Sequence, residues 1–355
     1  MKKVNLKTGI LEYQDSENLN QLISFGSRMN LKRGFLFVSK VLGKHLPTKP
    51  SIMEKNFHDL ANLINKVGNE KTLVIGFAET ATALGQGVFE ALNLENGEYI
   101  HTTRYNFSDS RLIEFMEEHS HAPSHILYQP KSNISEITNI ILVDDEVSTG
   151  KTTLNIVEEL KKVFPNVKKY SLVSMLNWSN LQNDEIEFLS LFSGKFHFEK
   201  KDYSVPTNLV SESENSQNLN NIITKDFGRF GVTKKLEIDF EQLLHNIDLG
   251  NKILVLGTGE FMYPPYLLAK YLENQGFDSY FQASTRSPIN IDGIIKSKIS
   301  FKDNYFENID NFLYNVENEK YDKILICYET ARIPANHNLK TILEKNMFSV
   351  QEIFF

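Results

Sequence analysis

The sequence predicts an α/β protein whose mainly parallel sheets are flanked by helices and divided between two domains. With 355 residues, the chain has the length of two domains, or three. Short apolar runs alternate with segments of helical spacing on both sides of a polar stretch at residues 200–225. Hydrophobic residues make up 41% and charged residues 23%, a globular composition that excludes collagen-like, coiled-coil and wholly disordered chains.

The first half supplies most of the α/β pattern. Five apolar residues at helical spacing predict its first helix: Met53, Phe57, Leu60, Ala61 and Ile64. The β-branched run at 72–77 predicts a strand buried on both faces. Runs at 140–143 and 170–176 predict two more strands, with a helix over 153–163 between them. Ligands of such sheets bind at the carboxyl ends of the strands.

The second half repeats landmarks of the first in the same order. The pairs are GFAE (76–79) with GTGE (257–260), TTR (102–104) with STR (284–286), and ILVDDEVSTGK (141–151) with ILICYETARIP (324–334). Nearly equal intervals predict an old duplication, in which Cys327 aligns with Asp144 and Glu329 with Glu146. Units of similar size could also give such spacing by chance. The expected divisions are a domain at 1–205, a linker or surface connection at 206–229 and a domain at 230–355.

Charge and cysteine content narrow the function classes. Lys and Arg number 38 against 45 Asp and Glu, a net charge of -7, so a general nucleic-acid-binding surface is not expected. Apolar runs fall short of the ~18–20 residues of a membrane span, and the N-terminal lysines precede no signal-peptide core. The single Cys327 excludes an internal disulfide and a cysteine zinc site. We therefore expect a cytoplasmic protein without nucleic-acid or membrane partners.

The strongest chemical signal is the segment IILVDDEVSTGKT at residues 140–152. An apolar strand ends in Asp144 and Asp145, and a turn containing Gly150 opens a helix. Converging N–H groups at a helix N-terminus suit a phosphate. The two acids suit ribose hydroxyls, or a magnesium ion shared with substrate oxygens. A Walker A loop requires glycine at position 145, so an ATPase is excluded.

This segment resembles the phosphoribosyl-pyrophosphate signature of type I phosphoribosyltransferases, although Glu146 stands where the family usually has an apolar residue. GFAETATALGQG (76–87) resembles the pyrophosphate loop of that family, and FMEEHSHAPSH (115–125) its mobile loop. A narrower resemblance links the chain to bacterial two-domain proteins that join a phosphoribosyltransferase domain to a TRSP domain. This narrower resemblance rests on four segments: RGFLFVSKVLGKHLP (33–47), EEHSHA (117–122), VDDEVSTGKT (143–152) and STRSP (284–288). Genes of that family often accompany tellurite-resistance and stress operons.

The resemblance implies magnesium-dependent transfer from 5-phosphoribosyl 1-pyrophosphate to a base-like acceptor in nucleotide metabolism. The implied catalytic residues are Asp144, Asp145, Glu146, Glu117, Glu118 and His119. The implied substrate-binding residues are Ala78, Glu79, Thr80, Ala81, Arg104, Ser148, Thr149, Gly150, Lys151, Thr152, Thr285 and Arg286. Asp144 and Asp145 are expected to hold magnesium largely through the substrate. The acids and histidines of 115–125 also allow a zinc site or a solvated surface.

Several alternatives stay open at this point. The second half is expected to be a degenerate copy that serves as a built-in partner subunit or supplies the acceptor pocket, and a homodimer is also possible. The candidates for stacking on the acceptor could equally be core: Phe35, Phe37, Phe196 and Phe198. A non-catalytic regulator that senses phosphoribosyl pyrophosphate or nucleotides is the chief alternative function, although no DNA-binding motif is recognised. Phosphoribohydrolysis or pyrophosphorolysis of a nucleotide is another.

Overall fold

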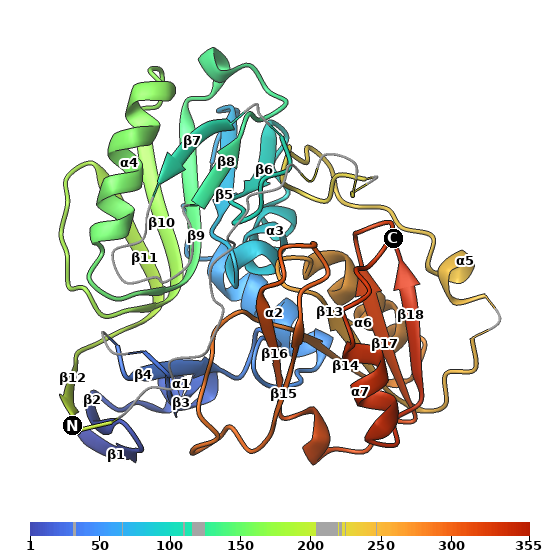
Figure 1. Cartoon of the computed structure of the whole chain (residues 1–355). Helices are drawn as coiled ribbons and strands as arrows, with labels where there is room; N and C mark the ends of the chain where they lie inside the picture. Colours follow the sequence, from blue (N-terminus) through green and yellow to red (C-terminus); the bar gives the residue numbers. More distant parts are fainter. Residues whose placement is uncertain are drawn as a thin grey trace.

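A computed structural model describes residues 1–30, 33–65, 67–108, 111–115, 125–203, 219, 222–223, 225–245 and 247–355. The chain forms two α/β halves, each built on its own parallel sheet (Figure 1). The predicted fold class is therefore confirmed. Every helix in the described part of the chain is too short or too polar to cross a bilayer.

The first half contains a five-stranded parallel sheet in the order β11-β10-β9-β5-β6. Its strands are β5 (Thr72–Gly76), β6 (Gly97–His101), β9 (Asn139–Val147), β10 (Lys169–Asn177) and β11 (Ile186–Ser193). Its main helices are α2 (Pro50–Ala61), α3 (Ala81–Leu92) and α4 (Lys151–Val163). Both α2 and α4 begin earlier than predicted, because a proline in the first turn starts α2 and a left-handed glycine starts α4.

Smaller elements surround this sheet. They are α1 (Glu17–Leu22), β1 (Lys2–Leu6), β2 (Gly9–Tyr13), β3 (Ile23–Ser27), β4 (Phe35–Ser39), β7 (Arg111–Phe115), β8 (His125–Tyr128), η1 (Ile134–Glu136) and β12 (Phe196–Lys200). The ring of Phe35 lies 5.0 Å from that of Phe196 and 4.9 Å from that of Phe198, and Phe37 stacks on Trp178 at 4.8 Å. Of the four phenylalanines considered for acceptor stacking, Phe35 and Phe37 are thus core residues, and Phe196 and Phe198 are partly buried against that core.

The second half has a four-stranded parallel sheet in the order β14-β13-β17-β18. Its elements are α5 (Phe240–Leu244), β13 (Lys252–Gly257), α6 (Tyr263–Asn274), β14 (Asp278–Ala283), β15 (Lys298–Lys302), β16 (Asp310–Tyr314), η2 (Val316–Asn318), β17 (Lys323–Tyr328), α7 (Leu339–Lys345) and β18 (Val350–Phe354). This chain path repeats that of β6-β5-β9-β10 in the first half, with the hairpin β15–β16 in the place of β7–β8. The shared topology supports the duplication.

Strand register corrects the residue alignment between the halves. In the first sheet Gly76 of β5 pairs with Val143, and in the second Gly257 of β13 pairs with Cys327. Cys327 therefore corresponds to Val143 and not to Asp144. With the alignment shifted by one residue, Glu329 corresponds to Asp145 and not to Glu146. The sequence alignment missed this shift because it matched landmarks at nearly equal intervals, whereas the paired residues are 67 positions apart in the first half (76 to 143) and 70 in the second (257 to 327).

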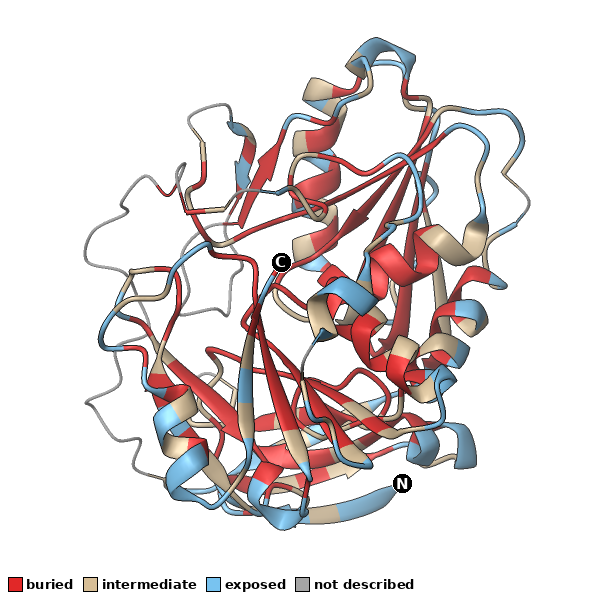
Figure 2. Ribbon diagram, turned by 90° about the vertical axis from the view of Figure 1, so that its right-hand side faces the viewer, coloured by how far each residue is buried: buried red, intermediate tan, exposed pale blue. Residues whose placement is uncertain are grey.

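Helices lie between the two halves. Figure 2 shows that the strands of both sheets are largely buried. Helices α3 and α6 are largely buried as well. Helices α3 and α6, which follow the first strand of each sheet, contact each other, and α2 also contacts α6. Equivalent elements that meet in this way are typical of an isologous dimer interface. Here both copies belong to one chain.

Several of the described residues near the C-terminal end of the segment that connects the two halves are buried. A polar surface connection was expected up to residue 229, but Leu219 and Ile222 are buried in a cluster with Tyr105 and Tyr305. Arg229 is only 2% exposed. The expectation fails here because these residues pack against side chains of both halves, which local polarity does not reveal.

A buried histidine makes stability depend on pH. Burial, aided by nearby Lys44 and Arg28, lowers the pKa of His45 from 6.5 to about 3. Because the unfolded chain takes up this proton below pH 6.5 and the folded chain does not until about pH 3, stability falls by about 1.4 kcal/mol per pH unit across that window. We expect wild type to lose about 2 kcal/mol more than His45→Gln between pH 7 and 5, measured by urea unfolding. Equal losses would contradict this, and exposed His58→Gln is the control.

Candidate functional site

Two acidic side chains and the turn predicted to bind phosphate lie at the carboxyl end of β9. Asp144 and Asp145 are the sixth and seventh residues of this strand and are half-buried. The turn at 148–150 follows at once and leads into α4, a helix of 13 residues whose N-cap makes no side-chain hydrogen bond. The predicted strand, acids and helix N-terminus are therefore brought together. Such a helix start carries partial positive charge and open N–H donors, which suit an anion.

Gly150 is required by the shape of this turn. Its φ of +74° lies in the left-handed region, which favours glycine. A Cβ at this position would lie 2.2 Å from Cδ1 of Leu181 in the loop after β10. Any side chain would therefore push this loop away from the turn.

Glu146 forms an ion pair that sequence analysis did not anticipate. Its Oε1 lies 2.6 Å from a guanidinium nitrogen of Arg33, whose charge also faces the Phe35 ring at 4.7 Å. Burial raises the pKa of Glu146 and Asp145 adds to this rise, whereas Arg33 opposes it. A charged partner therefore explains how an acid is accommodated where an apolar residue was expected.

The loop before α3 is held at both ends by internal hydrogen bonds. Ala78 N donates to Thr102 Oγ1 at 2.9 Å, and Ala81 N donates to the Phe77 carbonyl at 2.9 Å. Of the four predicted amides, these two are therefore already engaged. Those of Glu79 and Thr80 have no hydrogen-bond acceptor among the described residues. The expected anion-binding loop is thus reduced to two backbone donors.

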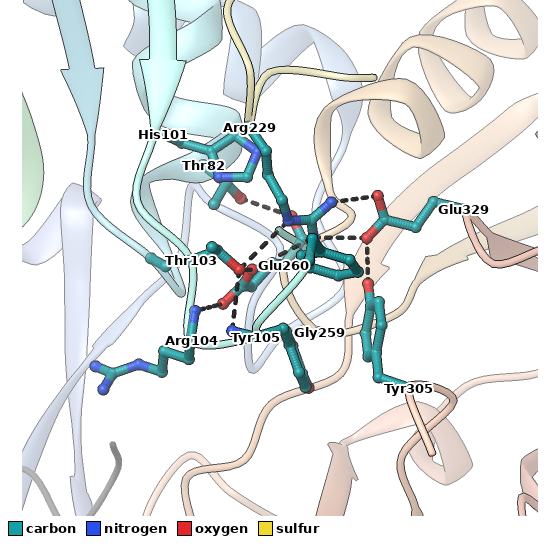
Figure 3. Close-up of polar contacts among 12 residues, drawn as sticks. Thr82, His101, Thr103, Arg104, Tyr105, Arg229, Gly259, Glu260, Tyr305 and Glu329 are labelled. Atoms are coloured by element: carbon teal, nitrogen blue, oxygen red, sulfur yellow. Dashed lines mark hydrogen bonds and ion pairs between the residues drawn. The ribbon is translucent and has the colours of Figure 1, made fainter. Parts of the chain in front are cut away.

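Arg104 follows the end of β6. Its backbone N donates to Glu260 Oε1 at 2.7 Å, and its side chain points away from that carboxylate (Figure 3). Three predicted catalytic residues, Glu117, Glu118 and His119, lie outside the described residues. Nearby His125 is buried, and its Nδ1 lies 2.9 Å from Thr102 Oγ1.

Each half accepts equivalent hydrogen bonds from the other across the interface between them. Glu260 of the second half accepts from Thr103 Oγ1 at 2.6 Å and from Arg104 N. Glu79 of the first half accepts from Thr285 Oγ1 at 3.0 Å and from Arg286 N at 3.4 Å. The glutamates correspond in the aligned sheets, as do the Thr-Arg pairs. This reciprocity supports the interpretation of the second half as a built-in partner.

Arg229 links Glu260 and Glu329 at the centre of this interface (Figure 3). Its guanidinium nitrogens lie 2.5 Å and 2.7 Å from the Glu329 oxygens and 3.3 Å from Glu260 Oε2. All three side chains are almost fully buried. Burial would lower the pKa of Arg229, but Glu329 outweighs it and holds the pKa well above its ordinary value.

The second half has lost the features of the first site. Arg229 covers Glu329, the counterpart of Asp145, and Tyr305 from the loop between β15 and β16 donates its hydroxyl to the same carboxylate. Proline follows at 334, where the first half has its phosphate turn. This region is therefore filled by the protein's own side chains.

Sequence analysis gave no role to Arg229 or Lys44. Lys44 is 1% exposed, and its Nζ donates to the Gly259 carbonyl at 2.8 Å and lies 3.4 Å from Glu79 Oε1. Lys44 gave no distinguishing local signal, because the mostly apolar segment at 35–46 also contains Lys40. Arg229 gave none, because its partner Glu329 lies 100 residues away.

Two family models match this chain. Residues 22–193 match a model described as phosphoribosyl transferase, and residues 226–345 match the TRSP domain that lies C-terminal to it. No curated protein gives a significant match.

Solved structures of several phosphoribosyltransferases are also similar to this chain. The adenine phosphoribosyltransferase of Thermoanaerobacter pseudethanolicus is 14% identical and matches 50% of this chain and 98% of its own, with a TM-score of 0.38. That of Trypanosoma brucei, solved with AMP, pyrophosphate and ribose-5-phosphate, is 14% identical over 54% and 87% of the two chains, with a TM-score of 0.37. The Helicobacter pylori xanthine-guanine-hypoxanthine enzyme is 14% identical over 39% and 82%, with a TM-score of 0.27.

Proposed function

Because residues 22–193 belong to the phosphoribosyl transferase family and residues 226–345 to the TRSP domain that follows it, we propose that the first half transfers a phosphoribosyl group from 5-phosphoribosyl 1-pyrophosphate to a base-like acceptor. The observation that carries this proposal is the end of β9, where two carboxylates lie on the strand that leads through the turn at 148–150 into the N-terminus of α4. The same groups would serve pyrophosphorolysis of a nucleotide in reverse.

Each part of the donor has a candidate partner. The 5-phosphate binds the turn and helix start at 148–152, where the Ser and Thr hydroxyls add donors. Asp144 and Asp145 accept from the ribose hydroxyls. The N–H groups of Glu79 and Thr80 bind the pyrophosphate, and Arg104 holds it bidentately.

The carboxylates at the end of β9 also fit magnesium. Among the described residues, no group of three or more acidic, His or Cys side chains could hold a metal ion by itself. Magnesium typically binds one or two carboxylates together with substrate phosphates, so Asp144 and Asp145 would hold it largely through the substrate. When bound, the ion would neutralise charge on the leaving pyrophosphate.

The chain's own residues then promote bond breaking. As the bond to pyrophosphate breaks, positive charge develops on the ribose, and the two aspartates stabilise it electrostatically.

Pyrophosphate release tests the proposed reaction. We expect wild type with magnesium and phosphoribosyl pyrophosphate to release pyrophosphate faster when one member of a nucleobase panel is added. A regulator that only senses the donor would bind it without release in the presence of any base. Release that no base accelerates would indicate hydrolysis of the donor by water and contradict the transferase.

A glycine variant tests the phosphate turn. We expect Gly150→Ala to weaken binding of ribose 5-phosphate about tenfold, because the added Cβ collides with Leu181 and shifts the turn. Gly276→Ala is the matched control, since this glycine also has a positive φ, of +92°, but a Cβ there meets no atom within 4 Å. Calorimetric titration of both variants is the measurement. Equal affinities in the two variants would contradict the assignment of the turn.

A further inference from the structure

We propose that Thr285 is a positioning residue for the pyrophosphate loop of the first half, acting through the side chain of Glu79. This inference rests on the proposed function and names the part of the donor on which the second half acts. Thr285 is 2% exposed and its hydroxyl donates to Glu79 Oε2 at 3.0 Å. It would therefore influence the substrate indirectly and not by touching it.

The Glu79 carboxylate needs hydrogen-bond and ion-pair partners because it lies in the loop that is proposed to bind an anion. Glu79 is one of the two residues in the loop whose backbone N–H is left to bind an anion, and its own carboxylate would repel that anion. Thr285 Oγ1, Arg286 N and the Lys44 ammonium surround the carboxylate at 3.0 Å, 3.4 Å and 3.4 Å. These contacts turn the negative charge toward the second half and partly neutralise it.

The second half also holds the other segment expected to bind pyrophosphate. Glu260 accepts from Thr103 Oγ1 and Arg104 N, and Thr82 Oγ1 at the start of α3 donates to the Glu260 carbonyl at 2.9 Å. Both pyrophosphate-side segments of the first half are thus fastened to the second half. The phosphate turn instead packs on Leu181 of its own half.

Because the second half is fastened to the two pyrophosphate-side segments, a change at Thr285 should affect binding of the pyrophosphate part of the donor. Thr285→Val keeps the size of the side chain and removes the donor to Glu79. We expect about tenfold weaker binding of magnesium pyrophosphate and of phosphoribosyl pyrophosphate, because a hydrogen bond to a charged group is lost. Binding of ribose 5-phosphate should stay as in wild type. Thr285→Ser keeps a hydroxyl donor and should bind pyrophosphate as tightly as wild type does.

Calorimetric titration of the full chain with the separate probes is the test, and thermal melting reports whether each variant is folded. Ser51→Ala is the matched control, because it removes a hydroxyl donor to Glu273 across the same interface, at 3.0 Å and away from the loop. If Thr285→Val does not fold, Thr285→Ala replaces it.

Three results would overturn the inference. They are unchanged pyrophosphate affinity in a folded Thr285 variant, an equal loss for ribose 5-phosphate, or the same loss in Ser51→Ala. Failure of wild type to bind any probe would instead overturn the proposed function together with this inference.

Discussion

We expect the Asp144→Asn/Asp145→Asn variant to bind phosphoribosyl pyrophosphate with magnesium at least about 100-fold more weakly than wild type. Each carboxylate contributes charge-assisted hydrogen bonds of about 1.5–3 kcal/mol, and every 1.4 kcal/mol is a factor of ten. Both side chains are half-buried at the end of β9, so the change should not disturb the core. Calorimetric titration gives the affinity, and thermal melting confirms the fold.

A matched change of charge elsewhere serves as the control. Asp184→Asn/Glu185→Gln removes two exposed acids before β11 and should leave the affinity for phosphoribosyl pyrophosphate as it is. Binding that persists in the Asp144/Asp145 variant would show that the acids do not hold the donor, whatever the family resemblance implies.

The second large effect concerns stability. We expect Arg229→Met to lower the free energy of unfolding by about 3–5 kcal/mol, because it leaves two buried carboxylates without their partner. Protonation of an orphaned carboxylate should relieve part of this cost, so the deficit should shrink as the pH falls. Urea unfolding at two pH values measures both effects.

Arg111→Met provides the comparison for this prediction. Its ion pair with Glu114 has a similar length of 2.9 Å, but the two side chains are 34% and 45% exposed. An exposed pair contributes at most about 1 kcal/mol. Similar losses in the two variants would mean that the buried network contributes little to the union of the two halves.

The elements of the proposed donor site could be predicted from sequence because their signal is local. An apolar strand, two acids and a glycine turn are contiguous, and the structure places them at the end of β9 and the start of α4. The repeat was also visible, since its landmarks stand at strand ends, where topology fixes their spacing. The residue alignment failed by one position because only strand pairing shows that Cys327 corresponds to Val143.

The interface could not be predicted in the same way. Arg229 stands in a polar stretch and Lys44 in an apolar one, and neither pattern shows that the residue is buried against the other half. Their partners Glu329 and Glu79 become neighbours only when the sheets face each other. Ion pairs between residues that are far apart in the sequence produce no periodic pattern from which they could be predicted.

The two halves thus share one topology but differ in their sites: the acids at the end of β9 are half-buried, whereas Arg229 and Tyr305 cover the remaining acid of the second half. Counting the bound donor molecules tests this asymmetry most directly. Calorimetric titration of wild type with phosphoribosyl pyrophosphate and magnesium should give one molecule per chain, and Asp144→Asn/Asp145→Asn should abolish it. Two molecules per chain, or one that survives in that variant, would contradict the account.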